Sequence, residues 1–273
     1  MRIKLLCIAI TVLALILCAC GNDSESGKSE ASSATPDGAE STTRDSSATP
    51  DEPTTEHVLD QNEIAVQKVL LLAEQQLKSQ SKQLDVEELF QTPELPTGCE
   101  SVALTAALNY LGYDIGKTEI ADNYMIYDDD MFWGYVGDPY SNNGAGIFPP
   151  GLTNTANLFF ETNGGNYSAV NTMDYSLDEL YRLVDSNCPV LVWTTMGFYE
   201  PNVIDTGYYY GEKEYFWYDN EHCMLLTGYD LKEKTVSFMD PLEGSVSCDA
   251  DDFEAIYNEI GKLSMTIVKL EKE

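Results

Sequence analysis

Three side chains of this sequence have the types and the chain order of a thiol-dependent catalytic site: Cys99, His222 and Asp240. Cys99 stands at the start of a run that predicts a helix, so its sulfur would lie among the unsatisfied N–H groups of the first turn. Because the partial positive charge of a helix end favours a thiolate, we expect a lowered pKa for Cys99. His222 would supply the base. Asp240 follows after one strand, a turn and a second strand, so a hairpin would place it beside His222.

Each of these residues also has a plain structural interpretation. Cysteines are often buried as small hydrophobic side chains, and an Asp-Pro pair such as Asp240-Pro241 commonly starts a turn. A histidine in a strand more often serves packing or hydrogen bonding than catalysis. The other histidine, His57, lies at the edge of a polar segment, where we expect it to be solvated.

The elements that would position these residues begin with helices. Residues 61–80 carry apolar side chains at helical spacing and predict an amphipathic helix. Thr97 and Glu100 have the S/T-x-x-E spacing of a capping box, which opens a helical run through Leu111 that Gly112 ends. Cys99 would then lie in the first turn of this helix.

Two further capping and loop signals follow. Ser176 and Glu179 form a second capping box, and it opens a predicted helix over 177–187. Residues 127–150 are rich in Asp, Gly, Asn and aromatic residues without a clear period, which predicts a long functional loop. Other short helices are predicted over 118–124 and 152–162.

Strands predominate after Asn187, where β-branched and aromatic residues become frequent. The pattern predicts a hairpin around Gly211 and a turn over 230–234 between two strands. The full set of predicted elements in this half is 189–196, 208–218, 222–229 and 235–239 as strands, 251–260 as a helix, and 263–270 as a strand. Helices followed by antiparallel strands indicate an α+β fold, with N-terminal helices packed on an antiparallel sheet.

The N-terminal segment has the layout of an exported lipoprotein. Arg2 and Lys4 precede a short apolar run, which ends in Leu17-Cys18-Ala19-Cys20-Gly21 and resembles a bacterial lipobox. We therefore expect a signal peptide over 1–19 and lipidation of Cys20, with an ordinary signal peptide as the alternative. Residues 20–58 are rich in Ser, Thr, Asp and Pro and predict a disordered tether, followed by a helical extension over 59–88.

Composition limits the partners and cofactors. The formal net charge of −31 opposes binding of nucleic acid, because phosphate contacts need clustered Lys and Arg. With two histidines and no CxxC pair, we expect neither a metal nor an organic cofactor. Cys223 is predicted to be a core residue, whereas Cys188 and Cys248 could form a disulfide or remain free.

Several spaced blocks resemble the C39-like cysteine peptidases, a papain-like family related to bacteriocin-leader peptidases. The resemblance covers 89–273 in this sequence. The blocks are Gln91 to Ser101 running into the 103–112 helix, Gly137-Asp138-Pro139, Gly146-Ile147-Phe148, Pro189 to Thr194, Asn220-Glu221-His222 running into Leu226 to Asp230, and Asp240 to Gly244.

This resemblance implies a peptidase in which Cys99 is the nucleophile, His222 the general base and Asp240 the residue that orients His222. It further implies that Gln91 donates a hydrogen bond to the oxyanion. With the predicted anchor, the substrate would be a peptide or protein at the outer cell surface. An acyltransferase with the same residues and a non-catalytic binding or adhesion lipoprotein are the alternatives. The oligomeric state and the substrate stay open.

Overall fold

The computed structural model describes residues 60–271. The predicted signal peptide, Cys20, the tether and His57 lie outside these residues. Between residues 60 and 271, no helix combines the length and the apolar character needed to cross a membrane.

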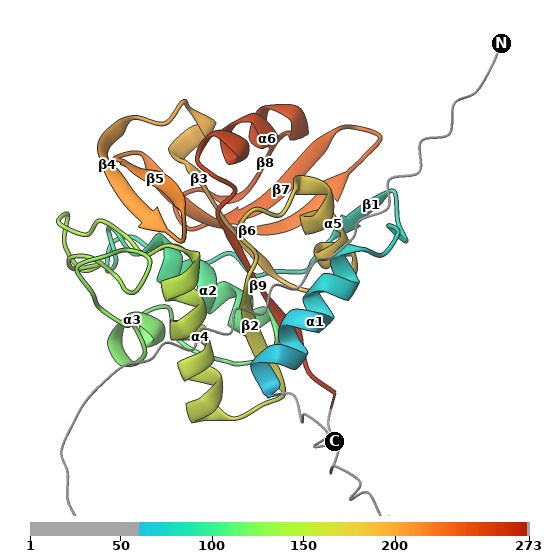
Figure 1. Ribbon diagram of the computed structural model, residues 1–273, viewed down its shortest axis with the longest axis horizontal. Helices are drawn as coiled ribbons and strands as arrows, with labels where there is room; N and C mark the ends of the chain where they lie inside the picture. Colours follow the sequence, from blue (N-terminus) through green and yellow to red (C-terminus); the bar gives the residue numbers. More distant parts are fainter. Residues whose placement is uncertain (1–59, 272–273) are drawn as a thin grey trace, which may run out of the picture. The chain divides into compact units, whose positions relative to one another are not determined.

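One antiparallel sheet of seven strands organises the chain (Figure 1). Its order is β2-β9-β3-β6-β7-β8, and the short strand β1 pairs with the far end of β6. Strands β4 and β5 form a separate two-stranded hairpin. The strands are β1 (Ser81–Gln83), β2 (Tyr167–Asn171), β3 (Val190–Thr195), β4 (Val203–Tyr210), β5 (Lys213–Tyr218), β6 (Glu221–Asp230), β7 (Thr235–Asp240), β8 (Gly244–Asp249) and β9 (Ser264–Lys269).

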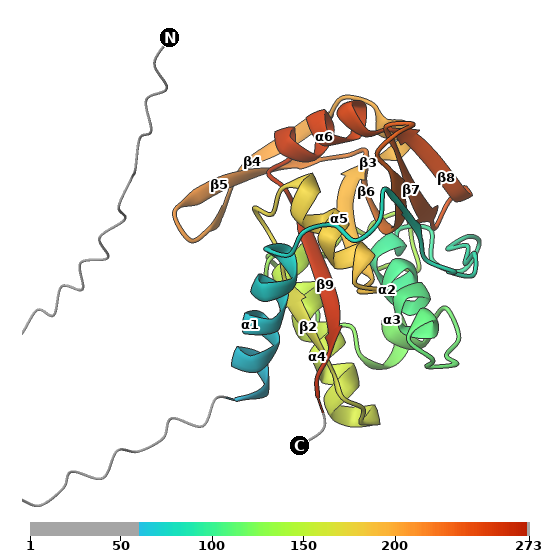
Figure 2. The same cartoon turned by 90° about the vertical axis from the view of Figure 1, so that its right-hand side faces the viewer.

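Helices cover both faces of this sheet. Figures 1 and 2 show α2 and α4 on one side of the central strands, and α1 and α5 on the other. The helices are α1 (Gln61–Ala73), α2 (Cys99–Tyr110), α3 (Glu119–Asn123), α4 (Pro149–Asn163), α5 (Leu177–Asp185), the short 3-10 helix η1 (Met196–Phe198) and α6 (Ala250–Glu259). Helices packed on an antiparallel sheet confirm the predicted α+β class.

Alternation along the central strands divides the buried side chains into two apolar cores. Leu191, Cys223 and Leu225 point toward α2 and α4. Val192 and Met224, which are their neighbours on β3 and β6, point toward the core shared with α1, α5 and α6. Helix α2 is apolar on nearly all its faces and buried from Cys99 to Leu108, as expected of a helix enclosed by other elements.

Some predicted boundaries were wrong. The helix expected over 61–80 ends at Ala73, and the residues after it include β1, so the segment before residue 89 is helical only in part. Strands β1, β2 and β8 were not predicted at all. Strand β1 has three residues and β2 has five, and β1 and β8 contain many polar residues, so their extended conformation depends on the ladder with a neighbouring strand.

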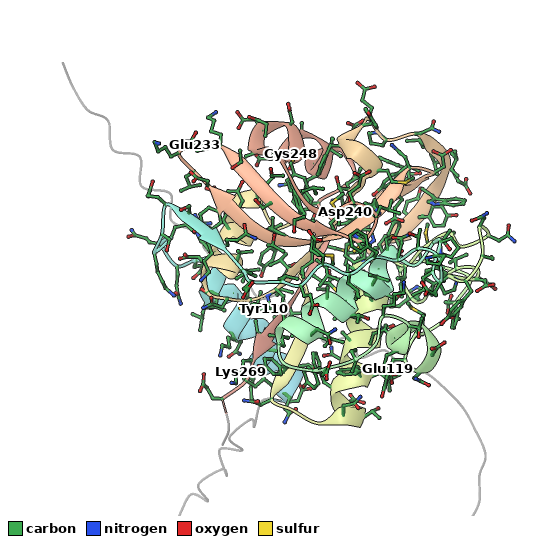
Figure 3. The ribbon with its side chains drawn as sticks, turned by 180° about the vertical axis from the view of Figure 1, so that it is seen from behind. Tyr110, Glu119, Glu233, Asp240, Cys248 and Lys269 are labelled. Carbon is green, nitrogen blue, oxygen red and sulfur yellow. The ribbon has the colours of Figure 1, made fainter. Side chains whose placement is uncertain are left out.

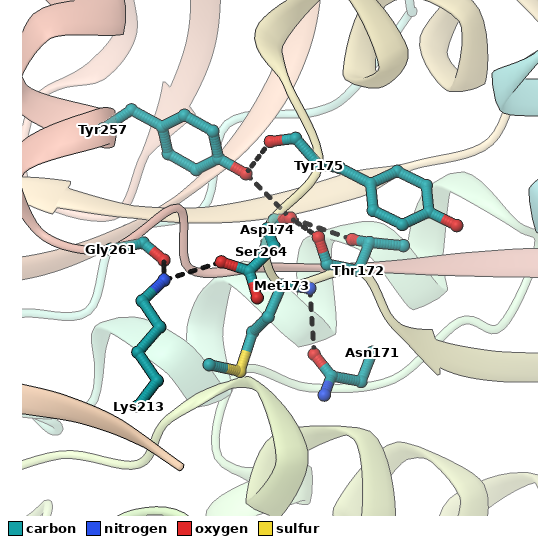
Figure 4. Close-up of polar contacts among 9 residues, drawn as sticks. All are labelled: Asn171, Thr172, Met173, Asp174, Tyr175, Lys213, Tyr257, Gly261 and Ser264. Atoms are coloured by element: carbon teal, nitrogen blue, oxygen red, sulfur yellow. Dashed lines mark hydrogen bonds and ion pairs between the residues drawn. The ribbon is translucent and has the colours of Figure 1, made fainter. Parts of the chain in front are cut away.

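A polar network anchors the β4–β5 hairpin to the rest of the fold (Figure 4). Lys213 of β5 donates to Asp174 Oδ1 at 2.6 Å and to the carbonyl of Gly261 at 3.0 Å. Behind this contact, the hydroxyl groups of Tyr257 and Thr172 lie 3.0 and 2.9 Å from Ser264 Oγ. The hairpin is therefore held by the segments that precede α5 and β9.

Candidate active site

Cys99 is the first residue of α2, as the sequence predicts, but the helix is not capped as predicted. Its N-cap is Gly98, and no side chain caps the helix. Thr97 Oγ1 instead donates to the carbonyl of Ser141 at 2.9 Å. The predicted Thr97–Glu100 capping box is therefore wrong, because contacts with the 127–150 segment occupy both side chains.

His222 and Asp240 lie side by side at one edge of the sheet, as predicted. His222 is the second residue of β6, and Asp240 is the last residue of β7. His222 Nε2 lies 2.6 Å from Asp240 Oδ1, and both side chains are almost fully buried. The N–H of Leu242 also donates to Asp240 Oδ1, at 2.7 Å. The Asp240 carboxylate is thus fixed by its own chain and can orient the imidazole.

Burial and hydrogen bonding have opposite effects on the pKa of Asp240. Burial raises the pKa of this carboxyl, but the hydrogen bond and charge of His222, with the N–H of Leu242, outweigh burial and leave the pKa below its ordinary value. Within residues 60–271, the other ring nitrogen of His222, Nδ1, makes no hydrogen bond. It is thus the ring atom that remains for proton transfer.

Cys99, His222 and Gln91 line one cleft of about 170 Å³. The backbone N–H of Gln91 donates to the carbonyl of Pro241, next to Asp240, at 2.9 Å. One N–H of Gln91 Nε2 donates a hydrogen bond to the carbonyl of Pro96 at 2.9 Å. The amide group has two N–H bonds, so the second remains for a group in the cleft. The rest of the wall includes Gly144 to Gly146, Met196, Trp217 and Leu242.

Two carboxyl groups that sequence analysis did not select lie beside the Cys99 thiol. The thiol donates to Glu100 Oε2 at 3.2 Å, while Glu100 Oε1 accepts the N–H of Ile147 at 2.8 Å. Glu221 is the second carboxyl. A Cβ added to Gly146 would lie 2.6 Å from Glu100 Oε1 and 3.1 Å from Glu221 Oε2, so only glycine fits between them.

Burial and these neighbours disfavour ionisation of the thiol. Burial, followed by the charges of Glu100 and Glu221, raises the pKa of Cys99 well above its ordinary value. The expectation of a lowered pKa was therefore wrong for this arrangement, because burial and two nearby carboxyl groups outweigh the helix end. Burial also raises the pKa of Glu100, and burial together with Glu100 raises that of Glu221.

Three buried polar atoms of residues that line this cleft have no hydrogen-bond partner among residues 60–271: Gln91 Oε1, Glu221 Oε1 and the hydroxyl of Tyr218. Cys99, Glu100 and Glu221 also offer one ligand atom each within 4.8 Å of one another. Thiolate and carboxylate are ligand types that Zn²⁺ accepts. This group is thus where a cation could be held, which sequence analysis did not foresee.

The other three cysteines between residues 60 and 271 are free. Cys223 is fully buried, as predicted for a core residue, and Cys188 and Cys248 do not form a disulfide. The residues that sequence analysis missed are Glu100, Glu221 and Tyr218. Glu100 and Glu221 directly adjoin Cys99 and His222 in the chain, and this adjacency was a usable signal.

Comparison with known families identifies the class of protein to which this fold and site belong. A family model described as "Peptidase_C39 like family" matches residues 83–265, which is more than half of the chain. The chain therefore belongs to the C39-like peptidase family, and its family and fold support a cysteine-peptidase-like function.

One protein of similar sequence and one solved structure agree with this family assignment. The chain is 27% identical over 208 residues to the uncharacterized protein YvpB of Bacillus subtilis (strain 168), covering 72% of this chain and 80% of that protein. A crystal structure from Bacillus anthracis, described as a candidate C39-like peptidase, superposes with a TM-score of 0.59 at 27% identity. That match covers 70% of this chain and 99% of the other.

Proposed function

We propose that this chain is a cysteine peptidase, anchored to the outer face of the cell membrane, that hydrolyses peptide bonds with Cys99, His222, Asp240 and Gln91. The observation that carries the proposal is the 2.6 Å contact of His222 Nε2 with Asp240 Oδ1, in the cleft that Cys99 also lines. This contact leaves Nδ1 as the atom that exchanges protons with the thiol and the substrate.

In the first half of the reaction, the Cys99 thiol gives its proton to His222 Nδ1, and the sulfur attacks the carbonyl carbon of the scissile bond. The carbonyl oxygen becomes an oxyanion, which accepts hydrogen bonds from the free N–H of Gln91 Nε2 and the backbone N–H of Cys99. Asp240 stabilises the imidazolium. Nδ1 then protonates the leaving amine, the C–N bond breaks, and an acyl-enzyme remains.

In the second half, water enters as the amine leaves. His222 accepts a proton from this water, which attacks the thioester carbon. The same oxyanion site holds the second tetrahedral intermediate, and its collapse releases the carboxylic acid and restores the thiol. If another amine replaced water at this step, the chain would act as an acyltransferase.

The contact between Cys99 Sγ and Glu100 Oε2 belongs to a resting state in this scheme. In the proposed reaction, the thiol gives up this hydrogen bond before it transfers its proton to His222. The neutral thiol suits this order, because a buried thiolate beside two carboxyl groups would be strongly disfavoured.

The location is proposed from the N-terminal sequence. The apolar run that ends in Leu17-Cys18-Ala19-Cys20 supports export and lipidation of Cys20, and the polar residues up to 58 would hold the peptidase domain away from the membrane. Metabolic labelling with a palmitate analogue tests this proposal: label should be incorporated by the wild-type chain and lost in Cys20→Ala.

Hydrolysis is tested with the full chain and a mixture of peptides of random sequence, with the products identified by mass spectrometry. We expect new termini with the wild type and none with Cys99→Ala or His222→Gln. Cys248→Ser is the matched control, since Cys248 is free and does not line the cleft. Cleavage that persists in Cys99→Ala would contradict the assignment of the nucleophile.

Two further outcomes separate the alternatives. Added hydroxylamine or glycinamide should appear in the products if the acyl-enzyme is transferred to amines in preference to water. A wild-type chain that cleaves no peptide, while Cys99→Ala keeps full cellular function, would favour a binding or adhesion lipoprotein.

A further inference from the structure

A second cavity lies away from the catalytic cleft, where α1 meets the core. Its volume is about 590 Å³, against about 170 Å³ for the cleft. Its walls come from α1 and the segment after it, the end of α2, β2, β9 and the segment between α5 and β3. Figure 3 shows two of its residues, Tyr110 and Lys269, on the lower part of the molecule, away from Asp240. The volume falls in the range of roughly 300–1,000 Å³ typical of ligand pockets.

The charge of this cavity is opposite to that of the chain. Three residues of its wall are lysines, Lys68, Lys78 and Lys269, and none is an aspartate or glutamate. The whole chain has 46 acidic and only 15 basic residues. An acid-free wall with three lysines is therefore a local concentration of positive charge, which favours an anion.

The three lysines of the wall differ in how far their ammonium groups are already paired. Lys68 Nζ donates to the carbonyl of Lys269 at 2.6 Å and to Glu271 at 3.2 Å, and the Glu271 side chain is 96% exposed. Within residues 60–271, the ammonium groups of Lys78 and Lys269 form no ion pair with a carboxylate. Lys269 Nζ lies 5.8 Å from the ring centre of Tyr167. Two ammonium groups thus remain for a ligand.

The rest of the wall is largely apolar. It includes Leu72, Tyr110, Leu111, Tyr167 and Ile267. A small inorganic anion would leave this surface unused, and a polyanion would be repelled by the net charge of −31. A ligand with one acidic head and an apolar tail satisfies both parts of the wall.

We infer that this cavity binds an anionic amphiphile, a molecule with one phosphate or carboxylate group and a hydrocarbon chain. The lysines bind the head, and the leucine, isoleucine and tyrosine side chains pack against the chain. The site is separate from the catalytic cleft, so the inference does not depend on the proposed peptidase activity.

Calorimetric titration of the full chain with dodecyl phosphate, below its micellar concentration, tests this inference. We expect saturable binding to the wild type. In the double variant Lys78→Gln/Lys269→Gln, the affinity should fall about tenfold or more for each charge-assisted contact removed. The double variant Lys232→Gln/Lys234→Gln is matched in charge; both lysines are exposed and outside the cavity, so it should bind like wild type.

The head and the tail are tested separately. Inorganic phosphate and the uncharged dodecyl maltoside should each bind at least tenfold more weakly than dodecyl phosphate, because each reaches only one part of the wall. Equal binding of dodecyl maltoside, equal binding by both double variants, or no binding of dodecyl phosphate would overturn the inference. Laurate and short-chain phosphatidylglycerol, added as competitors, distinguish a free fatty acid from a membrane lipid as the source of the ligand.

Discussion

Helices α2 and α5 begin with the same sequence signal but end up with different N-termini. Ser176 and Glu179 form both hydrogen bonds of a capping box at the start of α5. Thr97 and Glu100 have the same spacing at the start of α2, yet Glu100 contacts the Cys99 thiol and the N–H of Ile147. A capping box uses its carboxylate for helix stability, whereas α2 uses it to shape the surroundings of a thiol.

The two glutamates also differ in burial: Glu179 is partly exposed, whereas Glu100 is not. Glu179 lies in the first turn of α5, is partly buried, and has partners for its carboxylate at Ser176. Glu100 is fully buried, and its pKa is raised chiefly by burial. The helix that carries the candidate nucleophile therefore gives up a stable cap and gains a buried acid, as expected where function competes with stability.

The largest effect is expected when Cys99, the candidate nucleophile at the start of α2, is replaced. Cys99→Ser should reduce peptide hydrolysis by about 10⁴-fold or more, because the nucleophile is lost, while the unfolding temperature changes little. The measurements are product formation and a thermal melt. Activity that stays within tenfold of wild type would mean that the α2 N-terminus is not the catalytic centre.

The second test removes the charge that orients His222. Asp240→Asn should lower kcat by about 10²- to 10⁴-fold, because the amide cannot hold the imidazole tautomer or stabilise the imidazolium. KM should change much less. Asp249→Asn is the control, because Asp249 caps α6 and does not line the cleft. A similar loss of kcat in both variants would indicate a general effect of structure.

The third test compares the pH dependence of stability in Glu221→Gln and Glu179→Gln. The pKa of Glu221 is raised in the folded chain, so the folded state holds a proton that the unfolded state releases. Wild-type stability attributable to this group is complete below the unfolded pKa and is lost as the pH rises toward the folded pKa.

Glu221→Gln should therefore remove part of the decline in stability that the wild type shows as the pH rises above the ordinary pKa of a glutamate. Glu179→Gln should leave that decline unchanged, because the acid pair at α2 is intact. Urea denaturation at several pH values measures both effects. An identical pH dependence in wild type and Glu221→Gln would contradict the raised pKa of Glu221.

The smallest effect is expected at the cap of α5. Ser176→Ala should lower the free energy of unfolding by about 1 kcal/mol, because an N–H of the first turn loses its acceptor. Ser186→Ala, at the other end of the same helix, should change it by less than about 0.5 kcal/mol, because Ser186 is partly exposed and contributes only its backbone N–H to the helix end. Urea denaturation distinguishes the two. Equal stability of the two variants would show that the Ser176 cap contributes nothing.

Much of the site could be predicted because its signals are local. The capping box of α5, the hairpin around Gly211 and the strands that became β6 and β7 depend on residues close together in the chain. The order of strand, turn and strand then brings His222 and Asp240 together, since antiparallel neighbours lie side by side. The contact between them is confirmed, and their catalytic role stays a proposal.

The sequence by itself thus determined the fold class, the place of Cys99 at a helix start and the pairing of His222 with Asp240. Only the tertiary structure decided that Glu100 would contact Cys99 and Ile147 and form no cap, that Glu221 would lie near Glu100, and that burial would raise the pKa of the Cys99 thiol. The physical reason is that helix and hairpin propensities act over a few residues. Burial, carboxyl pairing and the strands β1, β2 and β8 depend on groups brought together only when the chain packs.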